Sequence, residues 1–225
     1  MASGVVLLTG FEAFGGSTVN PSQEVARRLH GTTIDGMGVV GHTLPVSLKQ
    51  IGSAIDRIVQ ETDPEIVISL GQSGSASTIV LERFAVNLAD FSAPDNDGAS
   101  VTDAALEGDG PTAIASRLPL RAIESALLDA GIPARLSNSA GTYLCNAAMY
   151  LFLIRTGPET PCGFIHLPCL PEQVATALKA ARDGEGPRPA STASMSLDLM
   201  VAAVRLAIQV TVRHAAESRV GLPSG

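Results

Sequence analysis

The chain has 225 residues, of which 45% are hydrophobic and 16% are charged, so it can form a buried core and does not resemble a disordered chain. Its formal net charge is -7, and the absence of a Lys/Arg cluster argues against a nucleic-acid-binding surface. Three cysteines without C-x-x-C spacing exclude a disulfide framework and a zinc pattern, and they favour the reducing cytoplasm.

The first third of the chain alternates short apolar runs with helical patterns. The expected elements are, in chain order, a strand at 5–9, a helix at 21–29, a strand at 38–42, a helix after Ser47 and a strand at 65–70. The first helix has Asn20 as its expected N-cap and Pro21 at its first position. The apolar run near the N-terminus is only four residues long and no basic region precedes it, so we expect no signal peptide.

The rest of the chain continues the alternation. Residues 78–88 look extended, and 95–111 are polar and glycine-rich, as in a long surface loop that covers a site. The other expected elements are a helix at 118–130, a strand at 134–138, a helix at 143–155, a strand at 162–167, a helix at 172–181, a loop at 183–190 and a long final helix. The final helix carries an apolar stripe of Leu197, Val201, Val204, Ile208 and Val212. No stretch approaches eighteen consecutive apolar residues, so we expect no membrane span.

This alternation predicts an α/β fold: one domain over residues 1–225, with three α/β/α layers and a mostly parallel twisted sheet covered by helices on both faces. Ligands in such folds bind beyond the carboxyl ends of the strands. We therefore expect residues 10–16, 71–75, 138–145 and 166–168 to lie close together.

Cys145 is the strongest candidate for chemistry. It follows the Ser/Gly/Thr cluster of "LSNSAGTYLCN" and stands at the start of an expected helix, where the helix N-terminus stabilises a thiolate. Free cysteine is also among the most buried residue types, so the local sequence leaves a packing role open. Cys162 and Cys169 lack such a helix start.

A cysteine nucleophile needs a base, and the base needs a group that orients it. His166 ends the apolar strand "GFIHLP" and is the best-placed of four histidines, although a structural role fits it equally well. Glu82 lies in the apolar run "IVLERFAV", where a charge is costly unless it is paired. Its neighbour Arg83 faces the opposite side of a strand, so a histidine or a distant arginine is the expected partner.

The other motifs favour a pocket for a small molecule over a nucleotide site, a serine nucleophile or a metal site. "TGFEAFGG" fits neither a dinucleotide nor a phosphate loop, but Phe11 and Phe14 would suit a flat, weakly polar ligand. "GQSGSAS" misses the G-x-S-x-G pattern and precedes an extended segment, which argues against Ser73 as a nucleophile. "HLPCLPE" is a poor metal motif because of its prolines, and "DNDG" is only a fragment of a calcium loop.

Taken together, the segments resemble the pyrrolidone carboxylate peptidases, also called type I pyroglutamyl peptidases. The segments that carry the resemblance occur in the family's order: "LLTGFEAFGGSTVNPS", "LGQSGSASTIVLERFAVNLAD", "APDNDG", "LSNSAGTYLCN", "GFIHLPCLPEQ" and "SMSLDLMVAAVRLAI". The resemblance implies a cytoplasmic cysteine peptidase that removes N-terminal pyroglutamate from peptides through a triad of Glu82, Cys145 and His166. It implies no metal or cofactor, and a homodimer or homotetramer.

The resemblance also implies a pocket for the lactam ring. Its expected residues are Phe11, Phe14, Gln72, Tyr143 and Leu144. Such a pocket needs apolar walls and a few amide partners, because pyroglutamate has no free amine.

The sequence departs from the family pattern at three positions. Ser92 replaces an arginine that is thought to polarise the scissile carbonyl, and losing one such donor costs on the order of 10²–10³ in rate. Ala93 replaces a larger aliphatic residue, and Cys169 stands where an aromatic residue is common. A weakly active family member that binds pyroglutamyl ends, or a hydrolase of another acyl or lactam substrate, therefore stays open as an alternative.

Overall fold

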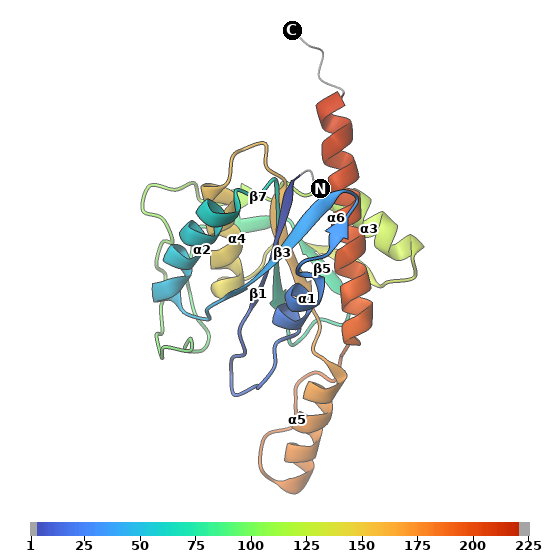
Figure 1. The fold of residues 1–225 in the computed structure, drawn as a ribbon. Coiled ribbons are helices and arrows are strands. Elements are labelled where there is room, and N and C mark those ends of the chain that lie inside the picture. Colours follow the sequence, from blue (N-terminus) through green and yellow to red (C-terminus); the bar gives the residue numbers. More distant parts are fainter. Residues whose placement is uncertain (1–3, 221–225) are drawn as a thin grey trace.

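A computed structural model describes residues 4–220 and shows a seven-stranded sheet between two layers of helices (Figure 1). The strands of this sheet are β1 (Val5–Phe11), β2 (Thr33–Ile34), β3 (Met37–Leu44), β4 (Ile66–Gln72), β5 (Ile79–Glu82), β8 (Ala134–Ser137) and β9 (Cys162–Leu167). A separate pair is formed by β6 (Phe84–Val86) and β7 (Ala113–Ala115). The helices are α1 (Pro21–Leu29), α2 (Leu48–Thr62), α3 (Leu120–Asp129), α4 (Leu144–Arg155), α5 (Pro171–Asp183) and α6 (Leu197–Val220).

The sheet has the order β2-β3-β1-β4-β9-β5-β8, and most of its pairs are parallel, which confirms the expected α/β fold. The β2–β3 and β5–β9 pairs are antiparallel. Strands β5 and β8 therefore begin at the edge of the sheet where β1, β4 and β9 end. Residues at the carboxyl ends of β1, β4 and β9 therefore lie near residues at the amino ends of β5 and β8.

Each face of the sheet buries its own apolar cluster. One cluster joins the sheet to α1, α3 and α6, and the other joins it to α2 and α4. Helix α4 is buried almost continuously from Leu144 to Leu153. Helix α5 contains no buried residue and projects from the body of the molecule (Figure 1).

Several local predictions are confirmed. The Asn20 side chain accepts a hydrogen bond from the Ser22 N–H at the start of α1, and Ser47 caps α2 in the same way through the Gln50 N–H. The first strand extends beyond its predicted end at Thr9, because Gly10 and Phe11 still pair with β3. A Cβ on residue 10 would lie 2.2 Å from the Ser22 carbonyl oxygen, so the strand can pass α1 this closely only with glycine there.

One other local prediction needs correction, and another is confirmed in outline. The single extended segment expected at 78–88 is two strands in different sheets, β5 and β6, and the chain changes sheet at Arg83. The loop at 95–111 contains no helix or strand, as predicted, but the side chain of Asp95 anchors it by accepting hydrogen bonds from three backbone N–H groups. One of these donors is Leu48, the first residue of α2.

Helix α6 was not expected to suit a membrane, yet residues Leu197–Ser218 are long and apolar enough to cross one. A packed helix of a globular core meets the same criteria of length and composition. Five of its residues are buried in the cluster shared with α1 and α3: Met200, Ala203, Val204, Ala207 and Ile208.

Candidate active site

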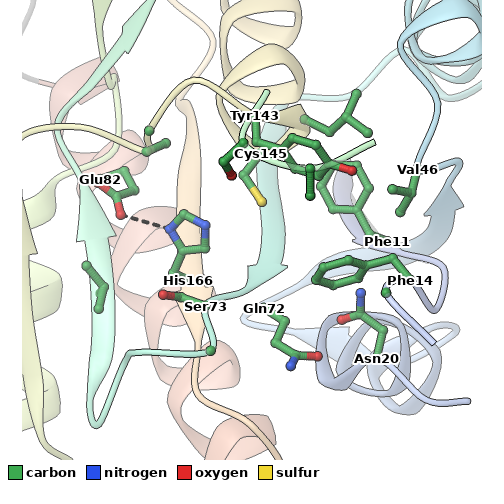
Figure 2. A pocket seen from close by; sticks show the side chains of 18 of the residues that line it. Phe11, Phe14, Asn20, Val46, Gln72, Ser73, Glu82, Tyr143, Cys145 and His166 are labelled. Carbon is green, nitrogen blue, oxygen red and sulfur yellow. Dashed lines mark hydrogen bonds and ion pairs between the residues drawn. The ribbon is translucent and has the colours of Figure 1, made fainter. Parts of the chain in front are cut away.

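A pocket of about 520 Å³ opens at the edge of the sheet where β1, β4 and β9 end. Its lining residues come from the segments 11–15, 72–74, 80–82, 92–94 and 135–145, together with Asn20, Val46 and His166. The four segments expected to meet near the strand ends are therefore all represented. The pocket also contains every residue that the sequence singled out for catalysis or ring binding (Figure 2).

Cys145 enters the pocket from the first turn of α4. Gly141 has a φ of 80°, so the turn before the helix uses a backbone conformation that favours glycine. Because α4 begins at Leu144, the Cys145 N–H is one of the first-turn donors without a partner inside the helix. The buried Asn146 side chain holds this turn in place, since its amide bonds the backbone of Val86 and Leu88.

Gly71 leaves room for the Cys145 thiol. A Cβ at residue 71 would lie 2.8 Å from the Cys145 Sγ and 2.7 Å from the Phe164 ring. The glycine at this position near the end of β4 is thus explained by a close approach of the backbone to this sulfur. Any larger residue at position 71 would displace the thiol or the ring.

His166 and Glu82 form a buried pair beside that sulfur. The His166 Nδ1 lies 2.8 Å from the Glu82 Oε1, and the two residues are only 8% and 2% exposed. They come from the antiparallel neighbours β9 and β5, whose register places Glu82 opposite Phe164. The Phe164 ring packs edge-on against the imidazole at 4.9 Å and holds its orientation. Figure 2 shows the imidazole between the Glu82 carboxylate and the Cys145 sulfur.

The pKa of His166 is raised from its usual value to about 9. Burial is the largest single influence and lowers this pKa, but the charge and hydrogen bond of Cys145, followed by those of Glu82, together outweigh it. A protonated imidazole is therefore favoured at neutral pH when the sulfur is a thiolate. The helix N-terminus favours negative charge at the same sulfur.

The opposite end of the pocket is aromatic. The Phe11 and Phe14 side chains lie on the far side of the Cys145 sulfur from His166 (Figure 2). Tyr143, which precedes α4, packs against the Phe91 ring at a centroid distance of 4.5 Å, and its hydroxyl donates to the Pro94 carbonyl. The apolar wall of the pocket thus comes from three separate segments, which contribute Phe11 and Phe14, Pro94, and Tyr143.

The Glu12 carboxylate connects the loop that carries Phe11 and Phe14 to the segment around Asn96. Its Oε1 accepts hydrogen bonds from the Val46 N–H and from the Asn96 side chain. Asn96 also donates to the Ala13 carbonyl, between the two phenylalanines. The segment around Asn96 therefore supports the Phe11–Phe14 loop, which is a structural role for the "DNDG" motif.

Gln72 lines the pocket as expected, but its amide already has protein partners. Its Oε1 accepts from Gln173 and its Nε2 lies 3.2 Å from the Cys169 sulfur. Gln173 also bonds the Val19 carbonyl and caps the start of α5. Gln173 thereby sets the orientation in which Gln72 faces the pocket.

A model of the pyroglutamyl peptidase family matches residues 4–214. The chain belongs to this family. It is thus a cysteine peptidase by descent, which accords with a pocket built around Cys145.

Relatives and solved structures agree with this peptidase assignment. The pyrrolidone-carboxylate peptidase of Chromobacterium violaceum is 42% identical over 217 residues, which cover 95% of each chain. The solved pyrrolidone carboxyl peptidase of Thermococcus litoralis is 39% identical, covers 96% of each chain and superposes with a TM-score of 0.87. A mutant of the Pyrococcus furiosus enzyme is 38% identical with a TM-score of 0.86, over 94% of this chain and 99% of that one.

Sequence reasoning about this peptidase missed several residues of the pocket. Asn20 was expected only as a helix cap, yet it also lines the pocket, as do Val46 and Arg135. Arg135 had a recognisable signal, because it lies in a predicted strand that leads to the Cys145 turn. Gln173 does not line the pocket but supports Gln72, and the local sequence could not indicate this contact, since it joins residues 101 positions apart.

The other histidines and the serine considered as catalytic residues either lie outside the pocket or lack a catalytic partner in it. His42 does not line it, and burial lowers the pKa of that imidazole. His30 accepts a hydrogen bond from the Gly41 N–H at the end of α1. Ser73 lines the pocket, but its hydroxyl contacts only Ser75 among the residues described. Within residues 4–220, no group of three His, Cys, Asp or Glu side chains is placed to hold a metal ion.

Proposed function

We propose that this protein hydrolyses the bond after an N-terminal pyroglutamyl residue, with Cys145 as nucleophile, His166 as acid and base, and Glu82 as the residue that orients His166. The observation that carries the proposal is the buried imidazole with Glu82 on one side and Cys145 on the other, beside an aromatic pocket. The names of its relatives support the same substrate.

In the first step, the Cys145 thiolate attacks the pyroglutamyl carbonyl carbon and forms a carbon–sulfur bond. The oxygen that becomes negative is stabilised by free N–H groups in the first turn of α4. His166 then gives its proton to the departing amide nitrogen, and the carbon–nitrogen bond breaks. The shortened peptide leaves, and a thioester remains on Cys145.

In the second step, water hydrolyses the thioester. Neutral His166 takes a proton from the water as its oxygen attacks the carbonyl, and the carbon–sulfur bond breaks. Pyroglutamate is released, and the thiolate–imidazolium pair is restored. Glu82 accepts the hydrogen bond of the Nδ1–H throughout, so that the other ring nitrogen faces the sulfur.

The aromatic end of the pocket is the proposed site of the lactam ring. Phe11 and Phe14 provide its flat faces, and Leu144 and Tyr143 close it next to the nucleophile. Gln72 is the proposed amide partner, in the orientation set by Gln173. Such a pocket excludes an ordinary charged N-terminus, because an ammonium group would lose its hydration against apolar walls.

The direct test is release of a chromogenic amine from an L-pyroglutamyl amide in reducing buffer. The matched substrate is the L-prolyl amide, which has the same ring size but carries an amine in place of the lactam. We expect turnover of the first and not of the second. A folded, fully reduced protein that releases no amine from the pyroglutamyl substrate would contradict the proposal.

Ser92 favours a second candidate, a protein that binds pyroglutamyl ends but hydrolyses them slowly. Ser92 lines the pocket where the family resemblance leads one to expect an arginine. We expect Ser92→Arg to raise kcat/KM for the pyroglutamyl amide by up to about 10²-fold, because the guanidinium can donate to the carbonyl oxygen as its charge develops. Steady-state kinetics on the purified variant measures this.

The control for that experiment is Ser125→Arg, which adds the same charge on an exposed part of α3. It should leave kcat/KM unchanged. If Ser92→Arg also leaves it unchanged, the serine does not limit the rate and the slow-enzyme alternative loses its support. A panel of other acyl and lactam amides separates the remaining alternative, a hydrolase of a different substrate.

We also propose a single peptidase domain, a cytoplasmic location, and assembly into a homodimer or homotetramer. The family match over residues 4–214 supports one domain. Helix α5 supports an assembly, because none of its residues is buried within the monomer.

A further inference from the structure

Arg135 is the one arginine or lysine among the residues that line the pocket. It lies on β8, the last strand of the sheet, and its side chain is exposed. Across residues 4–220 its side chain makes no hydrogen bond or ion pair. The family resemblance and the proposed triad give it no role.

The register of the sheet places Arg135 on the same face as His166. Val80 pairs with His166 on one side and with Arg135 on the other, so the three residues form one row across the strands β9, β5 and β8. Strands are about 4.8 Å apart, so two steps separate the two backbones by about 10 Å. Residues opposite one another on paired strands point to the same face. The extended arginine side chain can therefore reach toward the imidazole.

The same row fixes the side of the reaction on which Arg135 acts, if the proposed function is correct. The proposed lactam site is the aromatic end of the pocket, where Phe11 and Phe14 lie on the far side of the Cys145 sulfur from His166. His166 must face the departing nitrogen to give it a proton, so the leaving residue extends past His166 toward β5 and β8. Arg135 is the cation at that end.

We propose that Arg135 is a specificity-determining residue that favours substrates with a carboxylate on the residue after pyroglutamate. Such a carboxylate is either an acidic side chain or the free carboxyl end of a dipeptide. Glu82 is the one carboxylate among the residues that line the pocket, and its Oε1 lies 2.8 Å from the His166 Nδ1; among the described contacts it makes no ion pair with Arg135. This inference rests on the proposed function and specifies which leaving residue the enzyme prefers.

Two pairs of substrates test the two sources of the carboxylate. Pyroglutamyl-glutamate amide and pyroglutamyl-glutamine amide differ only in the side-chain charge. Pyroglutamyl-alanine and its amide differ only in the terminal charge. For at least one pair, we expect the charged member to have the higher kcat/KM by about fivefold, which is the scale of an exposed ion pair. The preference should shrink as salt is added.

The variant Arg135→Gln should reduce that ratio to about one, and Arg135→Lys should retain part of it. The control Arg121→Gln removes an equal charge from α3, where Arg121 pairs with Glu124, and should keep the wild-type ratio. Equal rates within both pairs for the wild type, or an unchanged ratio in Arg135→Gln, would overturn the inference. If the wild type cleaves none of the four substrates, that result would instead contradict the proposed function.

Discussion

Replacement of Cys145 by alanine is expected to lower kcat/KM for a pyroglutamyl amide by at least about 10⁴-fold. In the proposed mechanism the thiolate forms the covalent intermediate, and in a nucleophile–base–orienter triad the removal of the nucleophile costs nearly as much as the removal of all three members. The proposed lactam site is formed mainly by other residues, so binding should survive. Steady-state kinetics gives the loss of rate, and calorimetry with pyroglutamate or a pyroglutamyl peptide gives the retained affinity.

Cys162→Ala is the matched control for this variant. Cys162 is fully buried on β9, and burial raises the pKa of its thiol to about 12, so it stays neutral and does not react. We expect near-normal kcat/KM in Cys162→Ala after any loss of stability is taken into account. We expect iodoacetamide to inactivate both the wild type and this control, because each keeps Cys145. Normal turnover in Cys145→Ala would remove the proposed mechanism.

The fold could be predicted because most of its elements have local causes. Helix α1 begins where Asn20 can cap it and Pro21 fits the first position, and both signals are adjacent in the sequence. The change of sheet at Arg83 has no such local cause. The strands on either side of Arg83, β5 and β6, both contain apolar residues. They belong to different sheets only because β6 pairs with β7, some thirty residues further along the chain. The same holds for the direction of β5 and β8 against β9, which tertiary packing decides.

The candidate site could be predicted where a residue contradicts its surroundings. Glu82 is a charge in an apolar strand, so a buried partner was required, and His166 supplies it. Asn96 and Gln173 lie in segments that carry the family resemblance, but they are polar residues among polar neighbours, so the local sequence does not indicate their contacts. Their importance comes from contacts across the fold, with Glu12 and Gln72.

Replacement of Glu82 by glutamine is expected to lower kcat/KM by about 10³–10⁴-fold. A carboxylate fixes the imidazole tautomer and stabilises its charged form, and the amide of glutamine does neither reliably. In the comparable triad of subtilisin, loss of the carboxylate alone costs about 3 × 10⁴ in kcat. Glu24→Gln is a suitable control, because it removes a carboxylate from an exposed ion pair with Arg27 on α1 and should leave the rate unchanged.

The pH profile separates an orienting role of Glu82 from a purely structural one. In the wild type, kcat/KM should fall as pH rises through about 9, because His166, whose pKa is raised to that value, then loses the proton it must give to the leaving nitrogen. Glu82 contributes to raising this pKa, so the alkaline limb of Glu82→Gln should lie at lower pH than that of the wild type. The raised pKa of His166 also makes the stability of the folded state depend on pH. The stabilisation is fully present below pH 6.5 and is lost as pH rises through about 9. A variant that is slow but keeps the wild-type alkaline limb would show that Glu82 supports the fold without acting on the His166 proton.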